Sequence, residues 1–147
     1  MPSFSNNTGN VTVLGQNFQL AVDVQGSALK ATSVTIGSVS VRNTSANFIG
    51  TNLDWSSYKN IMLRVDNTLN QPITLTLQLQ GVGDYKDPTG ATVSITIPAS
   101  QSNVLVTSKE WNVLEQPIAG LLALKATAAT APTTGSVAVT AYVAPYI

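Results

Sequence analysis

The chain has 147 residues with neither cysteine nor histidine, and its seven Lys and Arg balance its seven Asp and Glu. These absences exclude Ser-His-Asp and Cys-His catalysis, disulfide scaffolds and nearly every transition-metal site. The charged fraction of 10% is far below the roughly 25% of typical soluble domains, so no basic excess favours nucleic acid or an anionic membrane, and the near-neutral surface favours association.

The first ten residues, MPSFSNNTGN, are polar and lack the basic and apolar regions of a signal peptide. No later stretch approaches the roughly 18 apolar residues of a membrane-spanning helix. We therefore expect a chain without a signal peptide, with an N-terminal arm at 1–10 and one β-sandwich domain at 11–147. Candidate assembly contacts of this arm are Met1, Pro2, Ser3 and Phe4.

Period-two patterns then follow along the first third of the chain. Residues 11–14 and 18–24 predict two strands or one bent strand, and 34–41 predicts β-branched strand segments around Gly37, where a turn, kink or bulge can form. Asn43-Thr44-Ser45 indicates a loop, and 48–53 predicts a further short strand.

Residues 55–81 hold the clearest strand patterns of the chain. Ile61, Leu63 and Val65 alternate with polar or flexible residues, and the same period of two recurs from Ile73 to Leu79. The intervening 66–72, DNTLNQP, contains the Asn, Asp and Pro residues of a turn. The segment therefore predicts a β-hairpin whose two arms are central core strands.

The remaining chain continues in strands. Residues 81–90 form a turn-rich connection, 93–97 and 104–107 predict strands, and 109–114 fits either a loop or one helical turn. Leu121–Thr127 and 136–143 predict a final hairpin with 131–135 as its turn. In total we expect an all-β, jelly-roll-like antiparallel sandwich of about eight to ten strands.

Few side chains in the sequence suggest chemistry. Asp84 and Asp87 lie in a Gly-rich loop, yet two carboxylates are too few for calcium, so turn chemistry is the favoured interpretation and no cofactor or metal is expected. Four aromatic side chains near predicted loops could instead contact a glycan or a partner protein: Trp55, Tyr58, Tyr85 and Trp111. For Trp55 and Tyr58, the favoured role is to plug the open end of the sandwich.

Three segments carry a resemblance to a known class of proteins: WSSYKNI at 55–61, IPAS at 97–100 and APTTGSV at 131–137. Over about 55–143 the chain resembles the small β-sandwich structural proteins of tailed bacteriophages, which include capsid decoration (cement) proteins and fibre or tail accessory domains. The resemblance implies a non-enzymatic protein with no catalytic residues to transfer.

From this resemblance we expect a capsid decoration protein that binds the outer capsid surface and stabilises the shell. Its partners would be the major capsid protein or other virion proteins and further copies of itself, with neither nucleic acid nor a membrane among them. It would be made in the host cytoplasm and reside in the virion. The alternatives are a tail or fibre accessory protein and a glycan-binding β-sandwich module.

Overall fold

The computed structural model describes residues 10–13, 16–19, 32–79, 83–116 and 120–145. The chain divides into two compact units, Met1–Lys30 with Ile147 and Ala31–Tyr146. In the first unit, β1 (Asn10–Val13) and β2 (Gln16–Gln19) pair antiparallel, with Asn10 opposite Gln19. The predicted strand positions from 20 to 24 and the arm residues Met1, Pro2, Ser3 and Phe4 lie outside the described residues. The predicted domain boundary at residue 10 stays a prediction.

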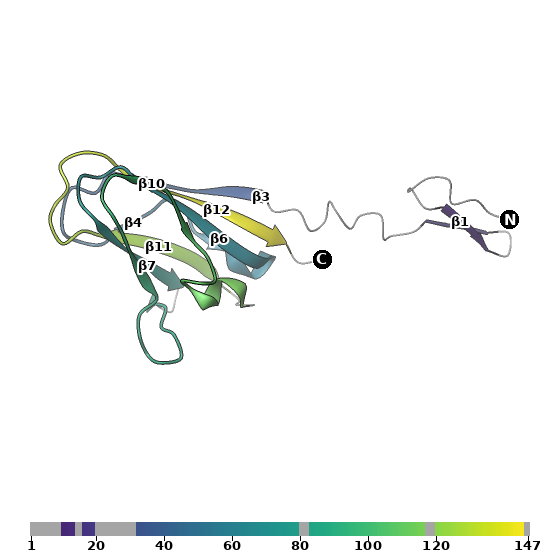
Figure 1. Ribbon diagram of the computed structural model, residues 1–147. Helices are drawn as coiled ribbons and strands as arrows, with labels where there is room; N and C mark the ends of the chain where they lie inside the picture. The colour runs from purple at the N-terminus through teal and green to yellow at the C-terminus, as the bar shows by residue number, and fades with distance from the viewer. Residues whose placement is uncertain (1–9, 14–15, 20–31, 80–82, 117–119, 146–147) are drawn as a thin grey trace. The chain divides into compact units, whose positions relative to one another are not determined.

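The second unit contains two antiparallel sheets around one hydrophobic core (Figure 1). The four-stranded sheet has the order β10-β6-β12-β3, and the six-stranded sheet has the order β4-β11-β7-β8, with β5 also on β11 and β9 also on β7. The strands are β3 (Thr32–Val39), β4 (Asn47–Phe48), β5 (Leu53–Asp54), β6 (Tyr58–Asn67), β7 (Ile73–Leu79), β8 (Gly83–Asp84), β9 (Ser94–Ile97), β10 (Gln101–Val106), β11 (Leu121–Thr127) and β12 (Val137–Pro145).

The all-β antiparallel prediction is confirmed. Besides strands, the described residues form two short 3-10 turns, η2 (Trp55–Ser57) and η3 (Asn112–Glu115), and no α-helix. The turn η3 overlaps 109–114, where the sequence fitted either a loop or a helical turn, and it ends one residue later, at Glu115. The predicted strand at 48–53 is instead the two-residue strands β4 and β5, which both pair with β11.

Alternation in the strands determines the core. β6 from Ile61 onward and β12 bury every second side chain, and Leu63 of β6 and Leu77 of β7 have zero exposure. β7 and β11 each bury one additional outward residue, Thr76 and Ala123, whereas β3 and β10 each bury a single side chain. A fully buried leucine contributes about 1.5–3 kcal/mol relative to an exposed one, so these inward rows dominate the stability of the unit. Gly37 produces the bulge that its position suggested, since the register of β3 against β12 shifts there.

The predicted hairpin at 55–81 is wrong in its pairing, although both strands exist. β6 belongs to the four-stranded sheet and β7 to the six-stranded sheet, so their connection crosses the core instead of turning within one sheet. The cause lies in the loop: Leu69 is fully buried between the sheets, and Asn67 is buried with it. Asn67 Oδ1 accepts from Leu69 N at 3.1 Å, and its Nδ2 donates to Pro98 O at 2.9 Å.

The predicted final hairpin is also wrong in its pairing. β11 lies in the six-stranded sheet and β12 in the four-stranded sheet. Their connecting loop bonds to the β6–β7 loop: Thr68 N donates to Ser136 O at 2.8 Å, and Thr133 N donates to Asn70 Oδ1 at 3.0 Å. Two inter-sheet crossings therefore support each other at one end of the sandwich.

Candidate functional site

The four aromatic residues singled out in the sequence occupy two environments. Trp55 has no exposed surface and Trp111 has 3%, so neither indole presents a ring face to solvent. Tyr58 and Tyr85 are half-buried and pack against the core. Of the four aromatic side chains, the two tyrosines are therefore the ones with partly exposed rings.

An interaction surface that the sequence did not single out lies on the outer face of the four-stranded sheet. We call it the outer patch, defined by Met62, Arg64, Leu105 and Tyr142. The register places Leu105 of β10 opposite Arg64 of β6, and Tyr142 of β12 opposite Met62. Leu105 is 48% exposed, and the other three side chains are partly exposed.

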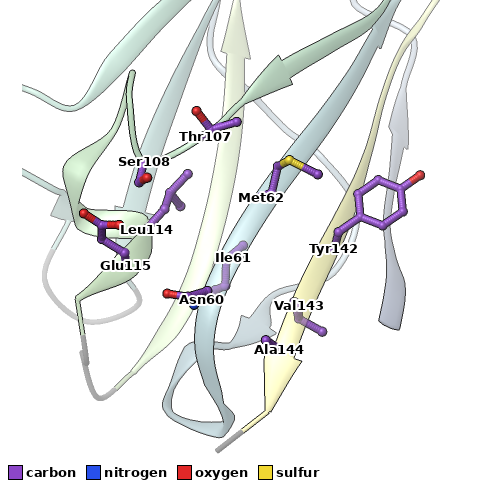
Figure 2. Close-up of a pocket in the computed structure, with 10 residues that line it drawn as sticks. All are labelled: Asn60, Ile61, Met62, Thr107, Ser108, Leu114, Glu115, Tyr142, Val143 and Ala144. Atoms are coloured by element: carbon purple, nitrogen blue, oxygen red, sulfur yellow. The ribbon is translucent and has the colours of Figure 1, made fainter. Parts of the chain in front are cut away.

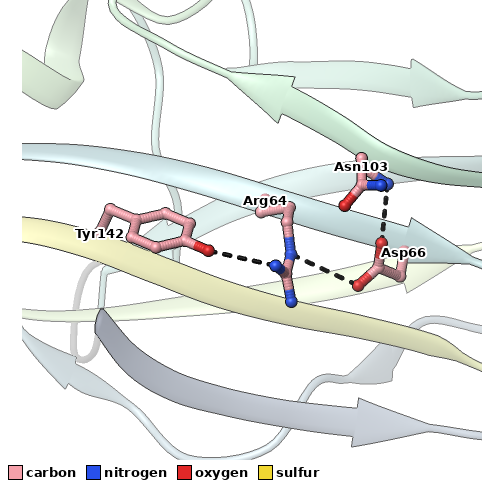
Figure 3. Close-up of polar contacts among 4 residues, drawn as sticks. All are labelled: Arg64, Asp66, Asn103 and Tyr142. Atoms are coloured by element: carbon pink, nitrogen blue, oxygen red, sulfur yellow. Dashed lines mark hydrogen bonds and ion pairs between the residues drawn. The ribbon is translucent and has the colours of Figure 1, made fainter. Parts of the chain in front are cut away.

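Hydrogen bonds hold the polar part of the outer patch in place (Figure 3). Arg64 Nη1 donates to the Tyr142 hydroxyl at 3.1 Å, and Arg64 Nε lies 3.5 Å from Asp66 Oδ2 as an ion pair. Asn103 N donates to Asp66 Oδ1 at 2.7 Å. Asn103 has a positive φ of 58°, beside a register shift of β10, so the bulged edge strand is anchored to the same network.

A notch of about 320 Å³ adjoins the outer patch and shares Met62 and Tyr142 with it (Figure 2). It forms because the ladder between β10 and β6 ends at Val106 and Leu63, whereas β6 continues back to Tyr58. The other lining residues come from the segment after β10, from η3 and from β6 and β12: Asn60, Ile61, Thr107, Ser108, Leu114, Glu115, Val143 and Ala144.

A second, larger groove lies between the loop after β8 and the segment around η3. We call it the loop–turn groove; its volume is about 690 Å³. It brings together Tyr85 and Trp111, two of the four predicted aromatic residues, whereas Trp55 and Tyr58 do not line it. The other lining residues are Lys86, Asp87, Pro88, Thr89, Thr92, Val93, Ser94, Glu110, Asn112, Val113 and Gln116.

Side-chain hydrogen bonds fix both walls of the loop–turn groove. In the loop wall, Asp87 Oδ1 accepts from Thr89 N at 2.8 Å and from Ala91 N at 3.1 Å, the geometry of an Asp-initiated turn. In the turn wall, Glu110 Oε2 accepts from both the backbone N and the hydroxyl of Thr107, at 2.8 and 2.7 Å. Hydrogen bonding by the Thr89 and Thr107 hydroxyls lowers the pKa of Asp87 and of Glu110, respectively.

The two aspartates of the Gly-rich loop serve different structural purposes. Asp84 Oδ1 forms an ion pair with Lys125 Nζ at 2.6 Å and accepts from Gln78 Nε2 at 3.0 Å on the outer face of the six-stranded sheet. The hydrogen bond from Lys125 holds the pKa of Asp84 below its usual value, and the bond from Gln78 adds to this. No group of three potential metal-ligating side chains occurs within the described parts of the chain.

Sequence reasoning missed the outer patch because its four residues come from three strands and are brought together only by register. A signal was nevertheless present. Met62 and Arg64 occupy outward positions of β6, between the inward aliphatic residues Ile61, Leu63 and Val65, and Leu105 stands between two inward valines. Apolar residues on the outward row of a strand are an indication of a contact surface.

One family comparison bears on this fold. The sequence pattern of the IPT/TIG domain matches residues 1–95. The chain belongs to the IPT/TIG domain family. The Ig-like β-sandwich of that family agrees with the two antiparallel sheets, so the predicted resemblance is confirmed at the level of the sandwich. A TIG domain is a general β-sandwich module, and the match ends within β9, before the strands that carry Leu105 and Tyr142.

The comparison with curated proteins gave no match. Within the described residues, no helix has the length and apolar character required to cross a bilayer.

Proposed function

We propose that this TIG-family protein is a non-enzymatic structural subunit that works by binding other protein chains through the outer patch. The observation that carries the proposal is the register that places Tyr142, Arg64, Met62 and Leu105 beside one another on three adjacent strands. Tyr, Arg and Met are enriched in protein interfaces, and Tyr and Arg are prominent among the residues that contribute most binding energy.

The geometry of the patch favours binding because its central side chain is already ordered. The bond from Arg64 to Tyr142 and the ion pair with Asp66 restrict the guanidinium before any partner arrives. Association therefore costs less side-chain entropy than it would for a free arginine. The adjoining notch offers a recess for an apolar side chain of the partner next to this ordered centre.

An open sheet edge supports the same function. Among the described strands, β3 pairs with β12 and with no other strand. Its sequence TSVTIGSV has no charge and no proline, two of the devices by which edge strands avoid pairing with other chains; the bulge at Gly37 interrupts part of the edge. Ile36 O accepts from Thr51 N, so the loop before β5 already satisfies one acceptor of β3. Strand addition at this edge would supply main-chain hydrogen bonds to a partner.

The more specific proposal is a capsid decoration protein of a tailed bacteriophage that binds the outer shell in many copies. It is supported by the sequence resemblance over 55–143 and by a near-neutral surface suited to dense packing. Symmetry would repeat each weak contact across the shell and so raise the overall avidity. A tail or fibre accessory subunit would use the same patch with a different partner.

Charge insertion into the patch tests the proposal. We expect Leu105→Glu to abolish self-association, as measured by light scattering, and to abolish co-sedimentation with expanded phage capsids. Its thermal stability should equal that of the wild-type protein. Phe48→Glu is the matched control, because Phe48 is also a large exposed apolar residue but lies on β4 of the other sheet. If the wild-type protein is monomeric and binds neither capsids nor tails, or if both variants behave alike, the proposal is wrong.

A further inference from the structure

The loop–turn groove is a second candidate site, separate from the outer patch. Its volume of about 690 Å³ lies within the usual range for small-ligand sites, about 300–1,000 Å³. Leu105, Arg64 and Tyr142 do not line it, so occupancy of the groove and association through the patch can be measured separately. We propose that the loop–turn groove binds a neutral saccharide, with Tyr85 as its aromatic contact and Trp111 as a hydrogen-bond donor.

The lining chemistry selects this class of ligand. Two acids, Asp87 and Glu110, outnumber one base, Lys86, so the charge of the described lining disfavours phosphate and nucleic acid. The amides of Asn112 and Gln116 can both donate and accept, which suits hydroxyl groups that do the same. The half-buried ring of Tyr85 supplies an apolar surface against which the C–H face of a sugar can pack.

The walls of the groove are ordered before a ligand binds. The Asp87 turn is closed by Asp87 N donating to Ala91 O at 2.8 Å, and Tyr85 is held to the sheet through Tyr85 N and Leu77 O at 3.0 Å. On the opposite side, Glu110 Oε2 accepts from Thr107 N, as in one half of a capping box, and Trp111 N donates to Thr107 O at 2.9 Å, which positions Trp111. A preformed site loses little conformational entropy on binding, which suits a weakly interacting neutral ligand.

An unpaired donor adds a second, independent observation. Trp111 is almost completely buried, and its Nε1 has no hydrogen-bond partner among the residues that the structure describes. A buried unpaired donor is costly, and a ligand oxygen would remove that cost. Trp55 Nε1 is also unpaired, yet Trp55 lines neither the groove nor the notch. Arg64 Nε also lacks a hydrogen bond, but it lies 3.5 Å from Asp66 Oδ2 as an ion pair, so of the two unpaired indole donors only that of Trp111 belongs to a residue that lines a groove.

The indole donors provide a matched pair of variants. The probe is a glycan microarray printed with bacterial-surface and plant oligosaccharides, followed by calorimetric titration with the best-bound oligosaccharide. We expect Trp111→Phe, which keeps an aromatic ring but removes the N–H, to weaken binding about tenfold. Trp55→Phe removes an equally unpaired N–H outside the groove and should leave the affinity unchanged.

The tyrosines give a second pair of variants. Both tyrosines are half-buried, so their replacement disturbs folding less than replacement of a buried tryptophan does. Tyr85→Ala is expected to abolish binding and Tyr58→Ala, a half-buried tyrosine elsewhere, to preserve it. Should Tyr85→Ala unfold, Asn112→Ala replaces an exposed lining residue and should weaken binding in a folded protein. Failure of the wild-type protein to bind any printed glycan, or equal affinity in the groove variants and their controls, overturns the proposal. Capsid or self-association assays with Leu105→Glu remain unaffected by either outcome.

Discussion

Asn67 is the residue at which the two inter-sheet crossings can be tested most directly. It is fully buried at the end of β6, and it bonds Leu69 N in the loop that follows and Pro98 O in the connection between β9 and β10. Asn67→Ala leaves the Leu69 N–H and the Pro98 C=O without this hydrogen-bond partner. Each unpaired buried group costs about 1–3 kcal/mol, and Pro98 is partly solvated, so we expect a loss of about 2–4 kcal/mol in the free energy of unfolding.

Asn70→Ala is the matched control for this prediction. Asn70 lies in the same loop and also makes two hydrogen bonds, to the backbone N and the hydroxyl of Thr133, but it is exposed. Water can replace both partners, so the expected loss is below about 1 kcal/mol. Urea unfolding followed by the fluorescence of the two buried tryptophans measures both variants. Equal losses, or a loss below about 1 kcal/mol for Asn67→Ala, would refute the role of burial.

Two further predictions concern stability. Gly135 and Gly90 both have positive φ, 85° and 88°, but a Cβ at Gly135 would collide with the backbone of Thr68, whereas Gly90 faces open space. We expect Gly90→Ala to cost about 1–2 kcal/mol from backbone strain alone and Gly135→Ala clearly more, as thermal unfolding of both variants would show. Because the bond from Lys125 lowers the folded-state pKa of Asp84, that interaction stabilises the fold above about pH 4 and is lost as the pH falls through the lowered value. Asp84→Asn should therefore flatten the acid limb of a pH–stability curve, and an unchanged limb would contradict this assignment.

The candidate sites were less predictable from sequence than the strands. The aromatic residues near loops were identified from the sequence. Their positions along the chain could not show that both indoles are buried, or that Tyr85 and Trp111 line the same groove. The carboxylates of Asp84 and Asp87 were open to a calcium interpretation; in the structure Asp84 forms an ion pair with Lys125, and Asp87 accepts short-range turn bonds. The outer patch depends on register across three strands, which no local pattern specifies.

The sequence by itself determined the long strands of this protein, such as β6, β7, β11 and β12, because a period of two with β-branched residues suits a half-buried extended segment. It also determined the antiparallel sandwich class, whereas at Gly37 it allowed a turn, kink or bulge, and the structure shows the bulge. Only the tertiary structure decided which strands pair. A hairpin and an inter-sheet crossing present the same alternation to one core, so the difference rests on the loop, where burial of Leu69 and Asn67 between the sheets directs β7 away from β6.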